Sequence, residues 1–231
     1  MRGKLGVLRM PMPWHKARFI KGNDELVIFL HGLWRSHWAM DPLARRVAAD
    51  GYSTLNLAYP SFKENLVEMV ARVAAVVEQE QAKYSKVHFV THSLGGVVVR
   101  NYLNNHAHGK CGRIVMLAPP LHGSRIVDWL QGSVLRGVLG PAGRFLSTRS
   151  MAAETEKVPS DVEAAVIMGN KVRIPLLHHL IQSESDGIIR VESGRVPGLK
   201  CFRVIEADHT LITLAPEVQD GVCQFLKCGK M

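Results

Sequence analysis

Residues 87–96 read Val-His-Phe-Val-Thr-His-Ser-Leu-Gly-Gly, and this stretch decides the fold. The apolar run at its start predicts a buried strand, and the residues from Leu94 to Asn104 predict a helix. Ser93 stands at the sharp turn between them, where a hydroxyl projects above the sheet as a nucleophile. Gly95 is the small residue that such a turn needs two positions after the serine, whereas Thr91 stands where glycine is commonest. The alternative is a surface serine in an ordinary turn.

A serine hydroxyl becomes a good nucleophile only when a neighbouring base takes its proton. In hydrolases built on this turn, an acid follows the serine and a histidine follows the acid. His209 is the only histidine after residue 179, and Asp186 lies between it and the serine, in a turn with Gly187. The sequence therefore predicts a triad of Ser93, Asp186 and His209, with Glu184 as the alternative acid. Glu192, Glu206 and Asp208 also lie between the serine and His209.

A second loop, His31-Gly32-Leu33-Trp34, directly follows the apolar run at residues 26–30. A loop in this place can aim a backbone N–H at the oxyanion that forms when serine attacks a carbonyl. Gly32 lets the backbone come close to the substrate, so the amide of Leu33 is the expected donor. The amide of Leu94, the residue after the nucleophile, is the expected second donor. We interpret His31 as structural.

Apolar runs alternate with helical patterns from residue 26 onward, which predicts a mostly parallel sheet with helices on both faces. Ser61 is predicted to cap a long helix, with Glu64 completing a capping box and Phe62 beginning its apolar stripe. Helices are also predicted at Pro42–Ala49, Leu94–Asn104 and Pro216–Leu226. Strands are predicted at Leu26–Leu30, Ser53–Ala58, Val87–Val90, Arg113–Ala118, Leu176–Gln182 and Lys200–Ile205.

The alternation is lost between Pro119 and Pro175, a stretch rich in glycine. Short amphipathic pieces at Ile126–Leu130 and Val134–Leu139 predict a helical cap over the sheet. The chain length suits one α/β domain. We therefore expect a single domain over residues 1–231, with the cap inserted at about 121–170.

Taken together, these motifs resemble the α/β-hydrolase fold and, more narrowly, small bacterial serine lipases and esterases whose nucleophile motif reads T/G/A-H-S-x-G-G. The resemblance covers residues 26–226. It implies a serine hydrolase that cleaves carboxylic esters through an acyl-enzyme on Ser93, without a cofactor. The matching segments are VIFLHGL at 27–33, THSLGG at 91–96, LAPPLHGS at 117–124, SDGII at 185–189 and ADHT at 207–210.

Three other classes of function compete with the esterase. An acyltransferase or a thioesterase would use the same triad. A non-catalytic binding module on this fold would usually have lost a triad member, and none is missing here. A metal-dependent hydrolase is disfavoured, so no metal is expected: His178 and His179 are adjacent in a predicted strand and point to opposite faces, and His106 and His108 lack a carboxylate cluster.

The cap is expected to border the acyl pocket, which suits a small-molecule ester with a hydrophobic acyl group. We name Trp34, Leu121 and Trp129 as candidate substrate-binding residues. Other apolar residues of the cap either line the pocket or pack the cap onto the sheet. Four arginines give the cap a basic face that fits an anionic head group or a membrane surface: Arg125, Arg136, Arg144 and Arg149.

The composition fits a well-cored globular protein, with 47% hydrophobic and 21% charged residues. No apolar run reaches the roughly 18–20 residues of a membrane span, and Arg9, Pro11 and Pro13 interrupt the only segment that resembles a signal peptide. We expect a cytoplasmic protein whose four cysteines are free thiols. The formal net charge of +9 comes from scattered residues without a nucleic-acid-binding motif, so no nucleic-acid partner is expected.

Overall fold

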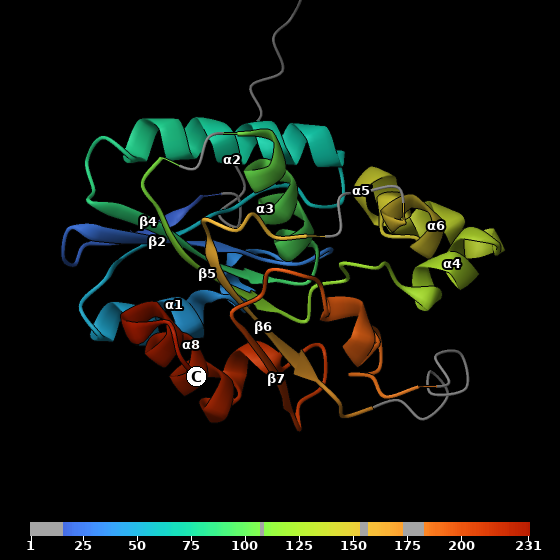
Figure 1. Cartoon of the computed structure of the whole chain (residues 1–231). Coiled ribbons are helices and arrows are strands. Elements are labelled where there is room, and N and C mark those ends of the chain that lie inside the picture. The colour runs from blue at the N-terminus through green and yellow to red at the C-terminus, as the bar shows by residue number, and fades with distance from the viewer. Residues whose placement is uncertain (1–15, 107–108, 153–156, 173–182) are drawn as a thin grey trace, which may run out of the picture.

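Strand β4 (Lys86–His92) is buried between two parallel neighbours, as its apolar run predicts. A computed structural model describes residues 16–106, 109–152, 157–172 and 183–231 (Figure 1). Within these residues, seven strands form one sheet in the order β1-β3-β2-β4-β5-β6-β7. Strand β1 is antiparallel to β3, and the other pairs are parallel. The remaining strands are β1 (Arg18–Ile20), β2 (Glu25–Leu30), β3 (Ser53–Asn56), β5 (Cys111–Leu117), β6 (Glu163–Gly169) and β7 (Cys201–Ile205).

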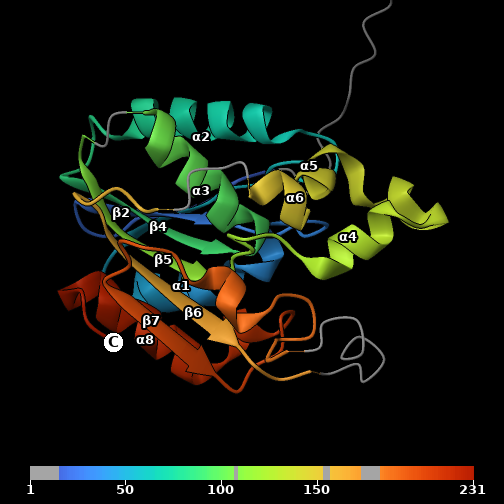
Figure 2. The same ribbon diagram turned by 45° about the vertical axis from the view of Figure 1, so that its right-hand side comes forward.

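Helices cover both faces of the sheet, as predicted. Figures 1 and 2 show α2 (Leu66–Glu80) and α3 (Leu94–Asn105) on one face, and α1 (Asp41–Ala49) and α8 (Pro216–Cys228) on the other. Each helix buries an apolar stripe, for example Met69 and Val73 of α2. Short 3-10 helices lie at η2 (His37–Ala39), η4 (Val191–Gly194) and η5 (Ile212–Leu214). In the described part of the chain, no helix is both long and apolar enough to cross a membrane.

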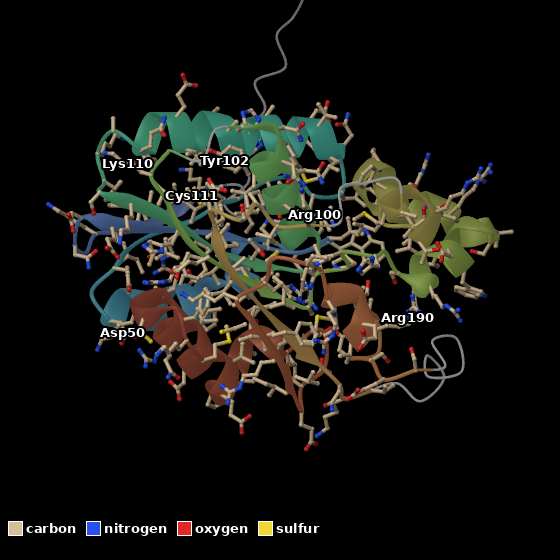
Figure 3. The ribbon with its side chains drawn as sticks, in the orientation of Figure 1. Asp50, Arg100, Tyr102, Lys110, Cys111 and Arg190 are labelled. Carbon is tan, nitrogen blue, oxygen red and sulfur yellow. The ribbon has the colours of Figure 1, made fainter. Side chains whose placement is uncertain are left out.

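The cap lies beyond the carboxyl end of β4 (Figure 2). It consists of α4 (Arg125–Gln131), η3 (Val134–Leu139), α5 (Gly140–Phe145) and α6 (Thr148–Met151). Asp128 connects α4 to α6. Its carboxylate accepts hydrogen bonds from the Thr148 amide at 2.9 Å and from the Thr148 hydroxyl at 2.8 Å. Arg100 of α3 is buried and donates from Nη1 to the Leu121 carbonyl at 3.1 Å, which fixes the segment leading into the cap (Figure 3).

Strand β6 corrects the prediction that residues 119–175 are irregular. It runs from Glu163 to Gly169 between β5 and β7 and is buried over residues 164–169. The helices of the cap end at Met151, so the boundary expected at about residue 170 is wrong. The strand predicted at Leu176–Gln182 lies outside the described residues.

The start of α2 also differs from the prediction. Residues 60–64 form a turn in which the amides of Lys63 and Glu64 donate to the Pro60 carbonyl at 2.8 and 3.1 Å. The helix therefore begins four residues later than a Ser61 cap would place it. Asn65 is the N-cap, and it exchanges hydrogen bonds with Glu68 in a capping box.

Candidate active site

Ser93 occupies the sharp turn between β4 and α3. Its backbone has φ +53° and ψ −120°, a conformation that L-residues rarely adopt, and its amide donates to the Leu117 carbonyl at 2.8 Å. Such strain persists only when the surrounding structure enforces it, and it is concentrated at functional sites. The turn therefore holds the Ser93 hydroxyl in a fixed position at the end of the strand.

The two glycines after the serine allow the helix to start against the sheet. A Cβ atom at Gly95 would lie 2.7 Å from the Leu30 carbonyl oxygen, and one at Gly96 would lie 2.8 Å from the Cβ of Pro119. Both distances are too short for a side chain. Thr91, the departure from the common glycine, is fully buried, and its Oγ1 lies 3.3 Å from where a Gly96 Cβ would stand. Because Gly96 has no side chain, there is room for the side chain of Thr91.

The structure brings His209 to the predicted nucleophile. Its Nε2 lies 3.1 Å from Ser93 Oγ, and its Nδ1 lies 2.6 Å from Asp186 Oδ2. Because a carboxylate only accepts hydrogen bonds, Nδ1 carries the proton and Nε2 is the free acceptor that faces the serine hydroxyl. The ring is therefore in the tautomer that a general base requires.

Three backbone amides hold Asp186 in place by hydrogen bonds. Its Oδ1 accepts from the amides of Ile188 at 3.0 Å and Ile189 at 2.7 Å, and its carbonyl accepts from the amide of His209 at 3.1 Å. The alternative acid, Glu184, is exposed and accepts from Asn170 at 2.9 Å. Of the two acids, Asp186 is the one in contact with His209.

The loop after β2 lies against the nucleophile turn. A Cβ atom at Gly32 would lie 3.1 Å from both Ser93 Cβ and His92 Nδ1, so the backbone here approaches the serine closely. His31 donates from Nδ1 to the Gly32 carbonyl at 2.9 Å and stacks on Tyr59, whose hydroxyl donates to the His31 carbonyl. Burial lowers the pKa of His31 to about 4. A neutral His31 therefore braces the loop that carries Leu33.

His92 is a site residue that the sequence analysis did not assign. Its ring lies 4.9 Å from that of His209, and Nε2 donates to the His209 carbonyl at 2.9 Å. Burial lowers its pKa well below the usual value, and His209 adds to the effect. His92 thus connects the nucleophile turn to the loop that carries His209. Its position next to the serine in the sequence was the available signal.

Ser93, His92 and His209 border a cavity of about 290 Å³, called the main cavity below. Trp34 lines it, whereas Leu121 is fully buried in the core and Trp129 is half-exposed, and neither borders the cavity. Ile188 and Ile189, beside Asp186, are lining residues that we did not predict. The apolar lining comprises Leu33, Ile126, Val127, Leu130, Leu139, Leu146, Ile188 and Ile189.

Metal ligation needs several donor side chains to converge. In residues 16–231, outside the three internal gaps of the description, no group of three or more His, Cys, Asp or Glu side chains is arranged to hold a metal ion.

A family model described as "Alpha/beta hydrolase family" matches residues 27–219 of the chain. The match includes the strand–turn–helix around Ser93, the loop at residues 31–34 and both partners of the serine. No curated protein sequence matches the chain.

Several solved structures share the fold. The mature form of the lipase BlEst2 from Bacillus licheniformis is 22% identical, with a TM-score of 0.75 over 96% of this chain and 95% of that one. The propeptide form gives a TM-score of 0.77 at 21% identity, covering 89% of this chain, which spans only 53% of that longer protein. A monoacylglycerol lipase from Paleococcus ferrophilus is 13% identical, with a TM-score of 0.63 over 91% of this chain and 97% of that one.

Proposed function

This chain belongs to the alpha/beta hydrolase family, and we propose that it is a serine hydrolase that cleaves carboxylic esters through an acyl-enzyme on Ser93. The observation that carries the proposal is the continuous chain of hydrogen bonds from Ser93 Oγ through His209 to Asp186. A serine, a correctly protonated histidine and a buried carboxylate in this order are the parts that activate a hydroxyl nucleophile.

In the proposed reaction, Ser93 Oγ attacks the ester carbonyl carbon while its proton passes to His209 Nε2. The tetrahedral intermediate collapses as the bond to the leaving oxygen breaks, and His209 returns the proton to that oxygen. Water, deprotonated by His209, then attacks the acyl carbonyl. The bond to Ser93 Oγ breaks, the carboxylic acid leaves, and His209 returns the proton to Oγ. Asp186 keeps the proton on Nδ1 and stabilises the imidazolium without taking the proton.

We assign the oxyanion hole to the amides of Leu33 and Leu94. Leu94 is the first residue of α3, where helix amides have no partner within the helix. Leu33 follows Gly32, whose backbone closely approaches Ser93. One such donor stabilises the transition state by about 2.7–4 kcal/mol.

The apolar lining of the main cavity favours an acyl group of hydrophobic character. An acyltransferase or thioesterase would use the same residues and differ in the group that accepts or supplies the acyl chain. We place the ester hydrolase first because Trp34, which lines the main cavity, is half-exposed, so the cavity is open to water as the acyl acceptor.

A fluorophosphonate probe tests the nucleophile directly. We expect the wild-type protein to be labelled and the Ser93→Ala and His209→Ala variants to lose labelling, in parallel with turnover of p-nitrophenyl esters of increasing chain length. Labelling that survives Ser93→Ala would contradict the mechanism. A folded wild-type protein with neither labelling nor turnover would favour a non-catalytic binding module.

The outer surface of the cap supports contact with an anionic lipid surface. Trp129, Val134, Leu135 and Val138 are exposed there, with Val134 at 99%. The four cap arginines form no ion pair within the described residues, and the acid of α4, Asp128, is engaged by Thr148. Exposed apolar side chains on the same element as exposed cations are typical of surfaces that bind at a bilayer interface.

Sedimentation with vesicles measures this contact without any substrate. We expect binding to vesicles rich in phosphatidylglycerol, weaker binding to phosphatidylcholine, and a loss of binding in Val134→Asp. Val67→Asp, which changes a valine 77% exposed on α2, is the matched control. Equal binding by the two variants would refute a specific role for the cap.

A further inference from the structure

A second cavity of about 300 Å³ adjoins the main cavity. One wall is the loop after β2, with Trp34, Arg35 and Ser36, and the other is residues 59–63 after β3. Trp34 and Arg35 line both cavities. The two spaces therefore lie next to each other, with these side chains at their boundary.

Lys63 gives the second cavity a second cation beside Arg35, which both cavities share. Arg35 and Lys63 line it, together with the hydroxyl side chains Ser36 and Ser61, and no acidic residue of the described chain does. Neither cation forms an ion pair within the described residues. The neighbouring acid, Glu64, is engaged by Arg72, whose Nε lies 3.2 Å from Oε2. The cavity thus presents positive charge without a counter-charge.

Arg35 is within electrostatic reach of the catalytic centre. Burial and the neighbouring His209 lower the pKa of His92, and the Arg35 guanidinium adds to the same effect. Since Arg35 lines the main cavity together with His92 and Ser93, a group held by Arg35 would lie near the reacting ester.

The boundary between the cavities is built at a conformational cost. Trp34 has φ +56°, in the left-handed region that L-residues rarely adopt. Its indole is 51% exposed, so burial does not offset this strain in full. A strained backbone conformation persists only where the surrounding structure enforces it, and such residues are concentrated at functional sites. Here the strain sets the indole between the two cavities.

The opposite wall is rigid. The Ser61 amide donates to the Tyr59 carbonyl at 2.9 Å, and the Lys63 amide donates to the Pro60 carbonyl at 2.8 Å. The Tyr59 hydroxyl bonds to the His31 carbonyl, which links this wall to the loop of Leu33. A preorganised wall lowers the cost of holding a ligand.

We propose that the second cavity binds an oxyanion, a phosphate or a carboxylate, carried on the leaving group of the ester, while the acyl chain occupies the main cavity. The proposal rests on the esterase function above. The two sides of an ester diverge from the carbonyl carbon that Ser93 attacks, and the apolar cavity suits only one of them. Arginine, lysine and hydroxyl groups are the donors that bind such oxyanions.

The test uses phenyl butyrates that share the acyl chain and differ in the para substituent: carboxylate, phosphate or neutral carboxamide. We expect kcat/KM to be about tenfold higher for the anionic esters, as one charge-assisted contact provides. Arg35→Gln and Lys63→Gln should each lower the ratio of kcat/KM for the anionic esters to kcat/KM for the carboxamide ester toward one. Lys21→Gln, which changes an exposed lysine outside both cavities, should preserve it.

Calorimetry with the inactive Ser93→Ala protein separates this inference from the proposed function. Phenyl phosphate should bind, and Arg35→Gln in the same background should weaken its binding by about tenfold. If phenyl phosphate binds but no ester is turned over, the esterase proposal fails and the binding site stands. Ester turnover without a preference for anions, or inorganic phosphate binding as tightly as phenyl phosphate, would overturn the leaving-group site.

Discussion

Asp186 is held by two sets of hydrogen bonds with different consequences. Because the amides of Ile188 and Ile189 fix Oδ1 as an acceptor, an asparagine here would keep its oxygen at that position and turn its NH₂ toward His209. The NH₂ group cannot accept from Nδ1–H, so the imidazole would adopt the wrong tautomer. We expect Asp186→Asn to lower kcat for p-nitrophenyl butyrate about 10⁴-fold. Glu184→Gln is the control and should retain activity, so equal losses would contradict the assignment of the acid.

His31 predicts how the stability depends on pH. Its pKa is lowered to about 4 by burial, from 6.5 in the unfolded chain, so the unfolded state binds the proton first as pH falls. The contribution to stability is complete above pH 6.5 and is lost as pH falls toward 4. At pH 5 the loss is about 2 kcal/mol relative to neutral pH.

Urea unfolding at pH 7.5 and pH 5 measures this loss. His31→Gln removes the titrating group, so the fall in unfolding free energy between the two pH values should be about 2 kcal/mol smaller than in the wild type. An unchanged fall in the variant would show that other groups account for the acid sensitivity.

At the residue scale, sequence order was enough to find Ser93, Asp186 and His209, and the structure places them in contact. The mechanism requires these residue types in this order, and His209 is the only histidine that follows Asp186 in the sequence. Leu121 and Trp129 were a different case. Their burial depends on how the cap packs, and a helix pattern alone does not say which neighbour a side chain will face.

At the scale of elements, the sequence before α2 contains two candidate capping boxes. Both Ser61–Glu64 and Asn65–Glu68 fit a capping box, and Pro60 assigns the first pair to a turn. We expect Asn65→Ala to lower the unfolding free energy by about 1 kcal/mol. Ser61→Ala should cost less, because no hydrogen bond of the helix end depends on it. A larger loss from Ser61→Ala in chemical unfolding would favour the earlier start.

Strand β6 was missed although its residues 164–168 form an apolar run. Two of them, Ala164 and Ala165, favour helices, and the glycine-rich region before the strand hides the alternation. Their burial arises from pairing with β5 and β7, which lie far away in sequence. Strands β2, β4 and β5 were predictable because each contains a local run rich in branched or aromatic apolar residues, whereas the run of β6 begins with two alanines.

Gly140 determines how the cap is seated. Its φ is +64°, and a Cβ atom there would lie 2.4 Å from the Phe62 carbonyl oxygen, so alanine requires the cap to shift. We expect Gly140→Ala to lower the unfolding free energy by about 1–3 kcal/mol and to reduce kcat/KM for longer acyl esters, since Leu139 and Leu146 line the main cavity. Gly137→Ala, where a Cβ meets nothing within 4 Å, is the matched control. Equal effects would mean that the Phe62 contact does not position the cap.

At the scale of the whole molecule, the parallel sheet explains why distant residues meet. Ser93 follows β4, Asp186 lies between β6 and β7, and His209 follows β7. Parallel strands end at the same edge, and ligands bind in open α/β sheets at that edge. The cap inserted after β5 lies over the same edge, so one fold supplies both the reacting groups and the apolar cavity.

The net charge of +9 acts on the same edge from a distance. A protein with a strong positive field attracts anionic substrates before they touch it, and salt screens this attraction, because the Debye length falls from about 30 Å at 0.01 M to about 3 Å at 1 M. We expect kcat/KM for the para-phosphate ester to fall as ionic strength rises over this range, while the para-carboxamide ester changes little. Arg35→Gln should lower the value for the phosphate ester at every salt concentration but retain most of the slope, since the other 28 of 29 basic residues still set the field. If the variant instead abolished the salt dependence, the attraction would come from the second cavity alone and not from the charge of the molecule.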